Sequence, residues 1–328
     1  MTEIDPMTQH EPRKNERSFS ERDGSMESAQ AIGSAMRSQQ VPRDDGALGE
    51  PTAAEAAPTG TVGFVLQGGG SLCAAQVGAL RALTQAGIVP DLIVGSSVGA
   101  LNGALFAADP GMEGIDRLEA LWLGLKRRHV APISLRTLIR AAVGRGEAAV
   151  SSAALQQLLR FRFSVGRLED AVVPVHVVAT DFETGTAVVL SQGDTVSALL
   201  ASAAFPGLYP PVQVGERLLV DGGVSADTPV LQAEALGATT IYVLPAAVTE
   251  ERESQAHTAV LAAYRALGQI LEERDRLHMA AVRGSVLRLP AVTTPTASLI
   301  DFHDTPHMVQ AGYSLTRDWL AQHPAART

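Results

Sequence analysis

A serine set between two glycines is the residue of this sequence best suited to nucleophilic chemistry. Residues 91–107 read DLIVGSSVGALNGALFA, so an apolar strand is expected to pass through the GSSVG corner straight into a helix. Gly-x-Ser-x-Gly is the pattern of a nucleophile elbow, in which the glycines leave room for a strained turn that presents the serine hydroxyl. We take Ser97 as the candidate nucleophile, with Gly95 and Gly99 as the elbow glycines. The alternative interpretation is a glycine-rich packing turn.

A glycine loop precedes this corner, in the stretch GFVLQGGGSLCAAQVGAL (63–80). Consecutive glycines at Gly68, Gly69 and Gly70 let the backbone come close to a ligand, and amides at a helix N-terminus attract negative charge. That charge could belong to a phosphate or to a developing oxyanion. A dinucleotide site is disfavoured because the glycine fingerprint ends at Cys73, and no Gly-Lys-Ser/Thr follows to make a P-loop.

The two motifs are expected to face one crevice. A single helix separates the strand before the glycine loop from the strand before Ser97, so the carboxyl ends of these strands should be neighbours. Backbone donors beside a nucleophile are the geometry that acyl transfer needs. The spacing of about 27 residues between Gly70 and Ser97 is too short for an ordinary α/β-hydrolase.

A serine nucleophile also needs a base within hydrogen-bond reach. Asp221, in RLLVDGGVSADTPV (217–230), ends an apolar strand and is our candidate; apolar surroundings would raise its proton affinity. An Asp-Gly turn is the alternative. Asp227 or Thr228, before Pro229, is interpreted as the cap and first turn of the next helix. A Ser-His-Asp triad would instead use a histidine, and the candidates are His176, His257, His303 and His307.

Taken in order, GGG (68–70), GSSVG (95–99) and DGG (221–223) resemble the patatin-like phospholipase family, bacterial members included. VVATDFETG (177–185) and ASAAFPGLYPPV (201–212) are also similar to stretches of that family, and the resemblance covers about residues 61–245, with a weaker likeness in DFHDTPHMVQAGY (301–313). It implies a Ser–Asp dyad without histidine, in which Ser97 is the nucleophile, Asp221 the base and Gly68, Gly69 and Gly70 the oxyanion loop.

The resemblance further implies a lipid acyl hydrolase, such as a phospholipase A, lysophospholipase or lipid esterase, that needs no metal or organic cofactor. One departure concerns the loop, because many members continue it with arginine and glycine where this chain has Leu72 and Cys73. The missing arginine puts a preference for charged headgroups in doubt. A Ser-His-Asp carboxylesterase and a catalytically silent scaffold that binds lipid or a partner are the alternatives.

The elements that would position these residues alternate between strands and helices. Strands are predicted at 61–67, 91–95, 174–180, 186–190, 217–220, 239–244 and 286–289. Helices are predicted at about 71–86, 98–108, 114–126, 133–142, 151–160, 195–203, 229–236, 256–281 and 305–322. Short apolar strands buried on both faces predict a three-layer α/β/α sandwich with a mostly parallel central sheet.

Composition sets the remaining expectations. Residues 1–60 contain few large apolar side chains and are predicted to be a disordered extension, residues 61–322 the acyl hydrolase domain and 323–328 a frayed tail. The chain of 328 residues has a net charge of −9, which argues against nucleic-acid binding. With no signal or membrane span recognised, we expect a cytoplasmic protein. The basic segment 126–145 could contact a membrane, although a solvated helix is the preferred interpretation.

Overall fold

The computed structural model describes residues 60–130, 151–162, 165–249, 259–295 and 298–327. The predicted extension 1–60 lies outside these residues except for its last position. The predicted helix at 133–142 and most of the basic segment 126–145 lie outside them as well, so both stay predictions.

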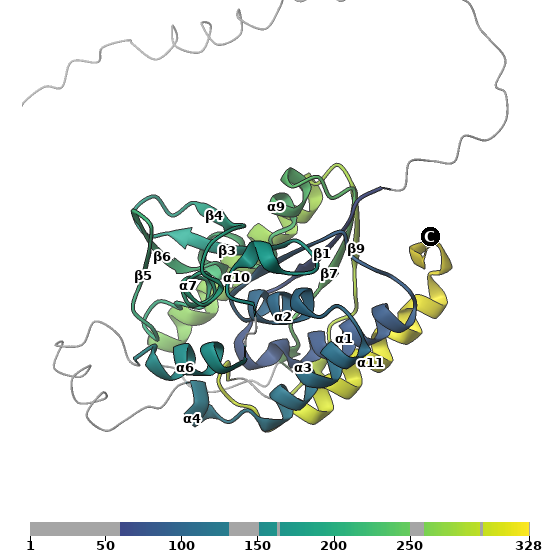
Figure 1. The fold of residues 1–328 in the computed structure, drawn as a ribbon, viewed down its shortest axis with the longest axis horizontal. Coiled ribbons are helices and arrows are strands. Elements are labelled where there is room, and N and C mark those ends of the chain that lie inside the picture. The colour runs from purple at the N-terminus through teal and green to yellow at the C-terminus, as the bar shows by residue number, and fades with distance from the viewer. Residues whose placement is uncertain (1–59, 131–150, 163–164, 250–258, 296–297, 328) are drawn as a thin grey trace, which may run out of the picture. The chain divides into compact units, whose positions relative to one another are not determined.

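An eight-stranded mixed sheet forms the centre of the fold (Figure 1). Its strand order is β5-β6-β3-β2-β1-β7-β9, and β4 also pairs with β3. The pairs that join β3, β2, β1, β7 and β9 are parallel, whereas β4, β6 and β5 are added antiparallel. The strands are β1 (Val62–Leu66), β2 (Leu92–Ser96), β3 (Val175–Asp181), β4 (Ala187–Leu190), β5 (Val212–Val214), β6 (Arg217–Asp221), β7 (Thr240–Leu244) and β9 (Ser285–Arg288). A separate parallel pair joins β8 (Val248–Thr249) and β10 (Thr293–Thr294).

Helices cover both faces of this sheet, which confirms the three-layer prediction. The first face carries η1 (Gly70–Cys73), α1 (Ala74–Gln85), α2 (Ser97–Ala108), α3 (Met112–Gly124), α6 (Ala153–Arg162), α7 (Thr195–Ser202) and α11 (Thr305–Gln322). The second carries α8 (Gly223–Ala226), α9 (Val230–Ala235) and α10 (Ala259–Ala281). Short pieces at α4 (Arg127–Val130), η2 (Leu168–Asp170) and η3 (Pro324–Arg327) complete the described helices.

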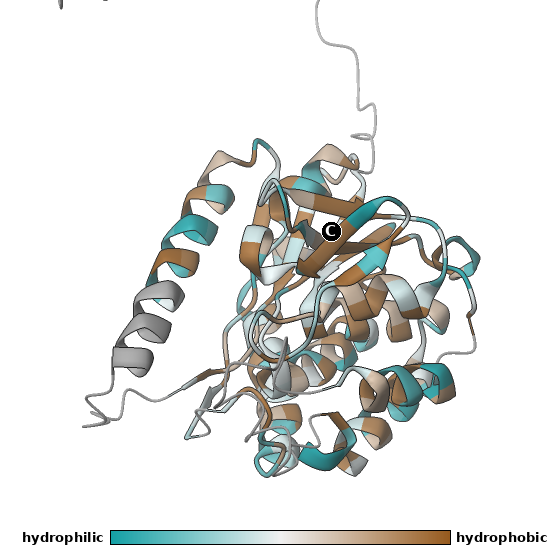
Figure 2. Ribbon diagram, turned by 90° about the vertical axis from the view of Figure 1, so that its left-hand side faces the viewer, coloured by the Kyte–Doolittle hydropathy of each residue, from teal (hydrophilic) through white to brown (hydrophobic). Residues whose placement is uncertain are grey.

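The strands are buried from both sides because their side chains alternate between the two layers. On β1, Phe64 and Leu66 join the core under α1 and α2, while Val65 joins the core under α9. All of these side chains are inaccessible to solvent. Figure 2 shows the central strands largely brown, whereas the covering helices carry both teal and brown bands. The continuous apolar strands of the sequence therefore predict the two-sided burial correctly.

All seven predicted strands are found, and the predicted helices within the described residues are found with small differences at their ends. The patterns missed the short elements β5, β8, β10, α4 and α8, which hold too few residues to show a period. The tail is also different from the prediction: instead of fraying, residues 324–327 form η3, and Ala326 is buried and accepts a hydrogen bond from the Tyr242 hydroxyl. Among the described helices, none is long and apolar enough to cross a membrane.

Candidate active site

Ser97 lies at the first position of α2, directly after β2, in a strained backbone conformation. Its φ of 51° makes it the one non-glycine residue with positive φ in the described part of the chain. The neighbouring glycines allow the turn, because a Cβ at Gly95 would lie 2.5 Å from the Cα of Ala100 and one at Gly99 would clash with the Leu66 carbonyl oxygen. A non-glycine residue in this region is worth noting as a functional candidate, so the strand-turn-helix context predicted for the elbow is present.

The hydroxyl of Ser97 donates a hydrogen bond to a carboxylate. Ser97 Oγ lies 2.6 Å from Asp221 Oδ2, and the second carboxyl oxygen, Oδ1, accepts from the amide of Gly223 at 2.8 Å. Asp221 is 2 % exposed, whereas Ser97 is only partly buried. The arrangement leaves the serine open to a ligand while its partner is shielded from water.

Burial changes the acidity of this carboxyl. Removal from water raises the pKa of Asp221 to about 7, the hydrogen bonds from Ser97 and Gly223 act in the opposite direction, and the nearby charge of Asp227 raises it further. A carboxyl with a pKa near neutrality can accept a proton at ordinary pH and return it later in a reaction. The expected increase in the proton affinity of Asp221 is therefore present.

Asp221 reaches Ser97 from a strand that is antiparallel to its neighbour. The aspartate ends an apolar strand, as the sequence indicates, and that strand, β6, runs antiparallel to β3. Asp221 pairs with Ala179 of β3, one residue beyond Val178, which pairs with Ser96. The aspartate thus arrives from the opposite strand direction, at the level where β2 ends.

The glycine loop lies beside the nucleophile, and not all of its amides are free. A Cβ at Gly68 would lie 3.3 Å from the Cβ of Ser97, so the loop borders the elbow. The amide of Gly68 donates to the Asp227 carbonyl at 3.1 Å, and that of Ser71 donates to the Leu299 carbonyl at 2.8 Å. Within the residues that the structure describes, the amides of Gly69 and Gly70 have no such partner. The amides of Gly69 and Gly70 are therefore the candidate anion donors of the loop.

Two features around the elbow were not found from the sequence. Ser202, at the end of α7, accepts a hydrogen bond from the Ser97 amide at 2.8 Å and donates to the Val178 carbonyl at 2.6 Å, so it anchors the strained turn to β3. The stretch ASAAFPGLYPPV that contains it resembles the family, but no spacing rule assigns the serine a role. The prediction that Asp227 caps the next helix is wrong: α9 begins at Val230 with no side-chain cap, and Asp227 instead accepts from Gln67.

The histidines of the described residues do not complete a triad. His176 contacts Ser191, the residue that follows β4, at 2.8 Å, and burial lowers the pKa of His176. His307 contacts Asp304 of its own helix, and His303 is exposed. Among the described residues, the Ser97 hydroxyl donates to Asp221 and not to a histidine. His257 lies outside the described residues.

The two residues that depart from the family pattern are both buried. Cys73 is inaccessible to solvent, its thiol donates to the Gln67 carbonyl, and burial together with the Asp227 and Asp221 charges raises its thiol pKa well above the usual range. A thiol held neutral in this way is a structural residue rather than a reactive one. Leu72 packs in the same core.

A hollow of about 670 Å³ opens on the side of the loop where the segment around Leu299 packs. Its lining includes the apolar Leu125, Ile300 and Phe302, the cations Lys126 and Arg127, and the acidic Asp301. Ser298, another lining residue, accepts through its carbonyl from the Ser71 hydroxyl at 2.9 Å. The hollow is therefore connected by a hydrogen bond to η1, which begins at the last glycine of the loop.

Comparison with known proteins agrees with this geometry. The profile of the family described as "Patatin-like phospholipase" matches residues 64–234. An uncharacterised NTE family protein of Mycobacterium tuberculosis is 33 % identical over 172 residues, covering 52 % of this chain and 27 % of that protein. A lysophospholipase of Aspergillus terreus is 28 % identical over 200 residues, covering 60 % of this chain and 12 % of that protein. The chain thus spans about a quarter or less of the length of these relatives.

Solved structures with a similar trace are more distant. VipD from Legionella pneumophila matches with a TM-score of 0.45 and 15 % identity over 92 % of this chain and 73 % of that one. Human GIVD cytosolic phospholipase A2 in complex with methyl gamma-linolenyl fluorophosphonate matches with a TM-score of 0.42 and 12 % identity over 82 % of this chain and 59 % of that one.

Proposed function

We propose a catalytic activity from two facts together: the chain belongs to the patatin-like phospholipase family, and Ser97 at a strained elbow donates a 2.6 Å hydrogen bond to a buried carboxylate. The activity is hydrolysis of a lipid acyl ester. The hydrogen bond between Ser97 and Asp221 is the observation that carries the proposal, because it pairs a nucleophile with a base of suitable proton affinity.

In the first half of the proposed reaction, Asp221 removes the proton of Ser97 while Oγ attacks the ester carbonyl carbon. The negative charge that develops on the carbonyl oxygen is stabilised by the free amides of Gly69 and Gly70; one such donor typically contributes about 3 kcal/mol. Asp221 then gives its proton to the leaving alcohol, and an acyl-Ser97 ester remains.

In the second half, Asp221 removes a proton from a water molecule, which attacks the acyl carbon and forms the acid. The proton returns to Oγ as the bond to Ser97 breaks, so the carboxylate and the hydroxyl are regenerated. A pKa near 7 suits both directions of transfer, because the group is neither too weak a base nor too weak an acid at neutral pH.

A lipid substrate is supported by the surroundings of the loop. The hollow beside it combines apolar side chains, which suit an acyl chain, with the cations Lys126 and Arg127, which suit an anionic headgroup. Family membership favours the same class, and the Aspergillus relative is named a lysophospholipase. We therefore propose phospholipid or lysophospholipid as the substrate class, with contact at a membrane surface through residues near 126–130.

The experiment is active-site labelling of the whole chain. We would treat the purified protein with a fluorophosphonate probe, read the intact mass, and use Ser97→Ala as the matched control. A single adduct that is lost in Ser97→Ala supports an activated nucleophile, and lysophospholipids and esters of graded chain length would then be assayed. Folded protein that forms no adduct at any pH from 5 to 9 would count against hydrolysis and favour a lipid-binding scaffold.

A further inference from the structure

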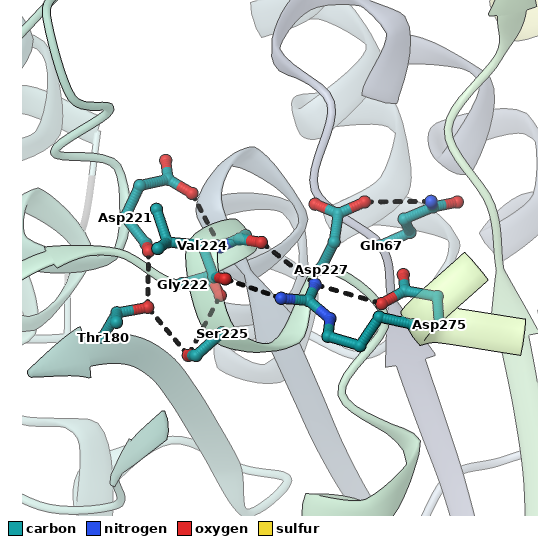
Figure 3. Close-up of polar contacts among 10 residues, drawn as sticks. Gln67, Thr180, Asp221, Gly222, Val224, Ser225, Asp227 and Asp275 are labelled. Atoms are coloured by element: carbon teal, nitrogen blue, oxygen red, sulfur yellow. Dashed lines mark hydrogen bonds and ion pairs between the residues drawn. The ribbon is translucent and has the colours of Figure 1, made fainter. Parts of the chain in front are cut away.

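A second carboxylate lies in the same site as the Ser97–Asp221 pair and has no part in the reaction proposed above. It belongs to Asp227, in the turn that follows α8, and Figure 3 shows it between Gln67 on one side and the Asp221 loop on the other. Asp221 Oδ1 and Asp227 Oδ1 are each 3.0 Å from the position that a Cβ of Gly223 would take, so no more than 6.0 Å separates them. Two carboxyl groups this close influence each other's charge.

Asp227 also touches the glycine loop at its first residue. Its Oδ2 accepts from Gln67 Nε2 at 2.9 Å, and its backbone carbonyl accepts from the Gly68 amide at 3.1 Å. A Cβ at Gly68 would clash with Asp227 Oδ1, so the loop backbone rests directly against this carboxylate. Gln67 in turn accepts, through its side-chain oxygen, from the amide of Ala246 at 3.3 Å. The first residue before the loop is therefore held between Asp227 and the segment that follows β7.

We propose that Asp227 is a positioning residue of this site: it holds the oxyanion loop in place through Gln67 and Gly68 and, as an anion beside Asp221, keeps that carboxyl a proton acceptor. The catalytic role of Asp227 rests on the proposed function. The support of the loop and the effect of the charge on Asp221 are physical properties of the folded chain. They can be measured whether or not Ser97 reacts.

The charged and titratable groups that face Asp227 come from three elements. Asp221 ends β6, Cys73 belongs to η1, and Arg274 and Asp275 belong to α10. Burial raises the pKa of Asp227 to about 6, the charge of Asp275 adds to this, and the Gln67 hydrogen bond and Arg274 lower it. When Asp227 is ionised, its charge raises the pKa of Asp221.

α10 holds the other side of this carboxylate. Arg274 donates to the carbonyls of Gly223 and Val224 at 3.1 and 2.6 Å and to Asp275 at 3.1 Å (Figure 3). It thus ties α10 to α8, the short helix between the two carboxylates. Arg274 also offsets part of the charge of Asp227, although its ion pair among the described residues is with Asp275.

Two substitutions separate the two parts of the proposal. Asp227→Asn removes the charge but leaves an oxygen that can accept from Gln67, whereas Asp227→Ala removes both. Asp170→Asn, at an exposed residue of η2, is the charge-matched control. The pKa of Asp221 would be measured by an NMR titration of its carboxyl carbon, with Asp221→Asn used to assign the signal. The protection of the loop would be measured by hydrogen exchange in a peptide that spans residues 62–72.

We expect the pKa of Asp221 to fall by about half a unit or more in both Asp227 variants, since a charge 6 Å away has at least that effect even at the dielectric constant of water. The rate of hydrogen exchange in the loop should rise about five-fold or more in Asp227→Ala only, because only this variant loses the hydrogen bond from Gln67. Asp170→Asn should change neither quantity. If Asp227→Ala does not fold, Gln67→Met removes the same donor and should give the same rise.

An Asp221 pKa unchanged to within about 0.2 units in Asp227→Asn would overturn the electrostatic part. Equal loop exchange in Asp227→Ala (or Gln67→Met) and the unsubstituted chain would overturn the positioning part. If both shifts are found but Ser97 forms no fluorophosphonate adduct, the inference stands and only the proposed hydrolysis fails.

Discussion

Replacing Asp221 by asparagine is expected to stabilise the protein above neutral pH while abolishing its proposed activity. Asparagine keeps the size of the side chain, can accept from the Gly223 amide through its oxygen and can donate to Ser97 through its nitrogen. It cannot ionise. The buried site therefore no longer has to hold a carboxylate, which is the cost that raises the pKa of Asp221.

The sign and size follow from the two pKa values. In the unfolded chain Asp221 ionises near 3.8, and in the folded chain near 7. As pH rises between these values, Asp221 releases its proton in the unfolded state but keeps it in the folded state. The stability that Asp221 contributes below pH 3.8 is therefore lost as pH rises through 7. At 1.36 kcal/mol for each pKa unit, the full loss is about 4 kcal/mol, of which roughly 2.5 kcal/mol falls between pH 5 and pH 8.

The assay is urea unfolding of both proteins at pH 5 and pH 8, with Asp170→Asn as the exposed control. We expect the stability of Asp221→Asn, relative to the unsubstituted chain, to be greater at pH 8 than at pH 5 by roughly 2.5 kcal/mol. The control should show no comparable difference, because Asp170 is exposed. A relative stability that is the same at both pH values would refute the reasoning, since it would mean that Asp221 ionises in the fold as easily as in water.

Three further predictions concern the elbow and the loop. Ser97→Gly should be more stable than Ser97→Ala by about 1 kcal/mol in thermal or urea unfolding, because only glycine relaxes at the positive φ; equal stability would show that the turn is not strained. Gly70→Ala should lose far more stability and fluorophosphonate labelling than Gly215→Ala. The two glycines have nearly the same φ, 57° and 59°, so the backbone strain is matched. A Cβ at Gly70 would clash with the Leu299 carbonyl, whereas a Cβ at Gly215 has nothing within 4 Å. Ser202→Ala should destabilise the chain by about 1–3 kcal/mol and slow labelling of Ser97, whose amide it leaves without a partner; an unchanged labelling rate would contradict this.

The features that could be predicted from the sequence are those fixed by local chemistry. Ser97 is recognisable because the glycines on either side indicate a tight turn that residues with a Cβ do not allow. The strands of the parallel sheet are recognisable because burial on both faces leaves continuous apolar runs, as in VGFVL and LIVGS. The family resemblance then assigned a role to Asp221, and the structure places it 2.6 Å from Ser97.

The features that were missed depend on contacts between distant parts of the chain. Ser202 lies 105 positions from Ser97, and Asp227 lies 160 positions from Gln67. Neither separation leaves a pattern in the sequence, and Asp227 before Thr-Pro has the local form of a helix cap. The direction of β6 was missed for a related reason, because a five-residue apolar strand looks the same whether it pairs parallel or antiparallel.

The antiparallel entry of β6 helps to explain how a site of this kind can work without histidine. In a triad, a third group orients the imidazole. Here the main chain orients the proposed base, since Asp221 donates through its amide to the Ala204 carbonyl at 3.0 Å and accepts through its carbonyl from Thr180 at 2.7 Å. Burial then brings the carboxyl pKa to about 7, close to the 6.5 of a free histidine. Orientation thus comes from the hydrogen bonds of the strand, and the largest contribution to basicity comes from its burial. A change that admits water to Asp221 should therefore lower its pKa and weaken its proton affinity even where the 2.6 Å contact with Ser97 is kept.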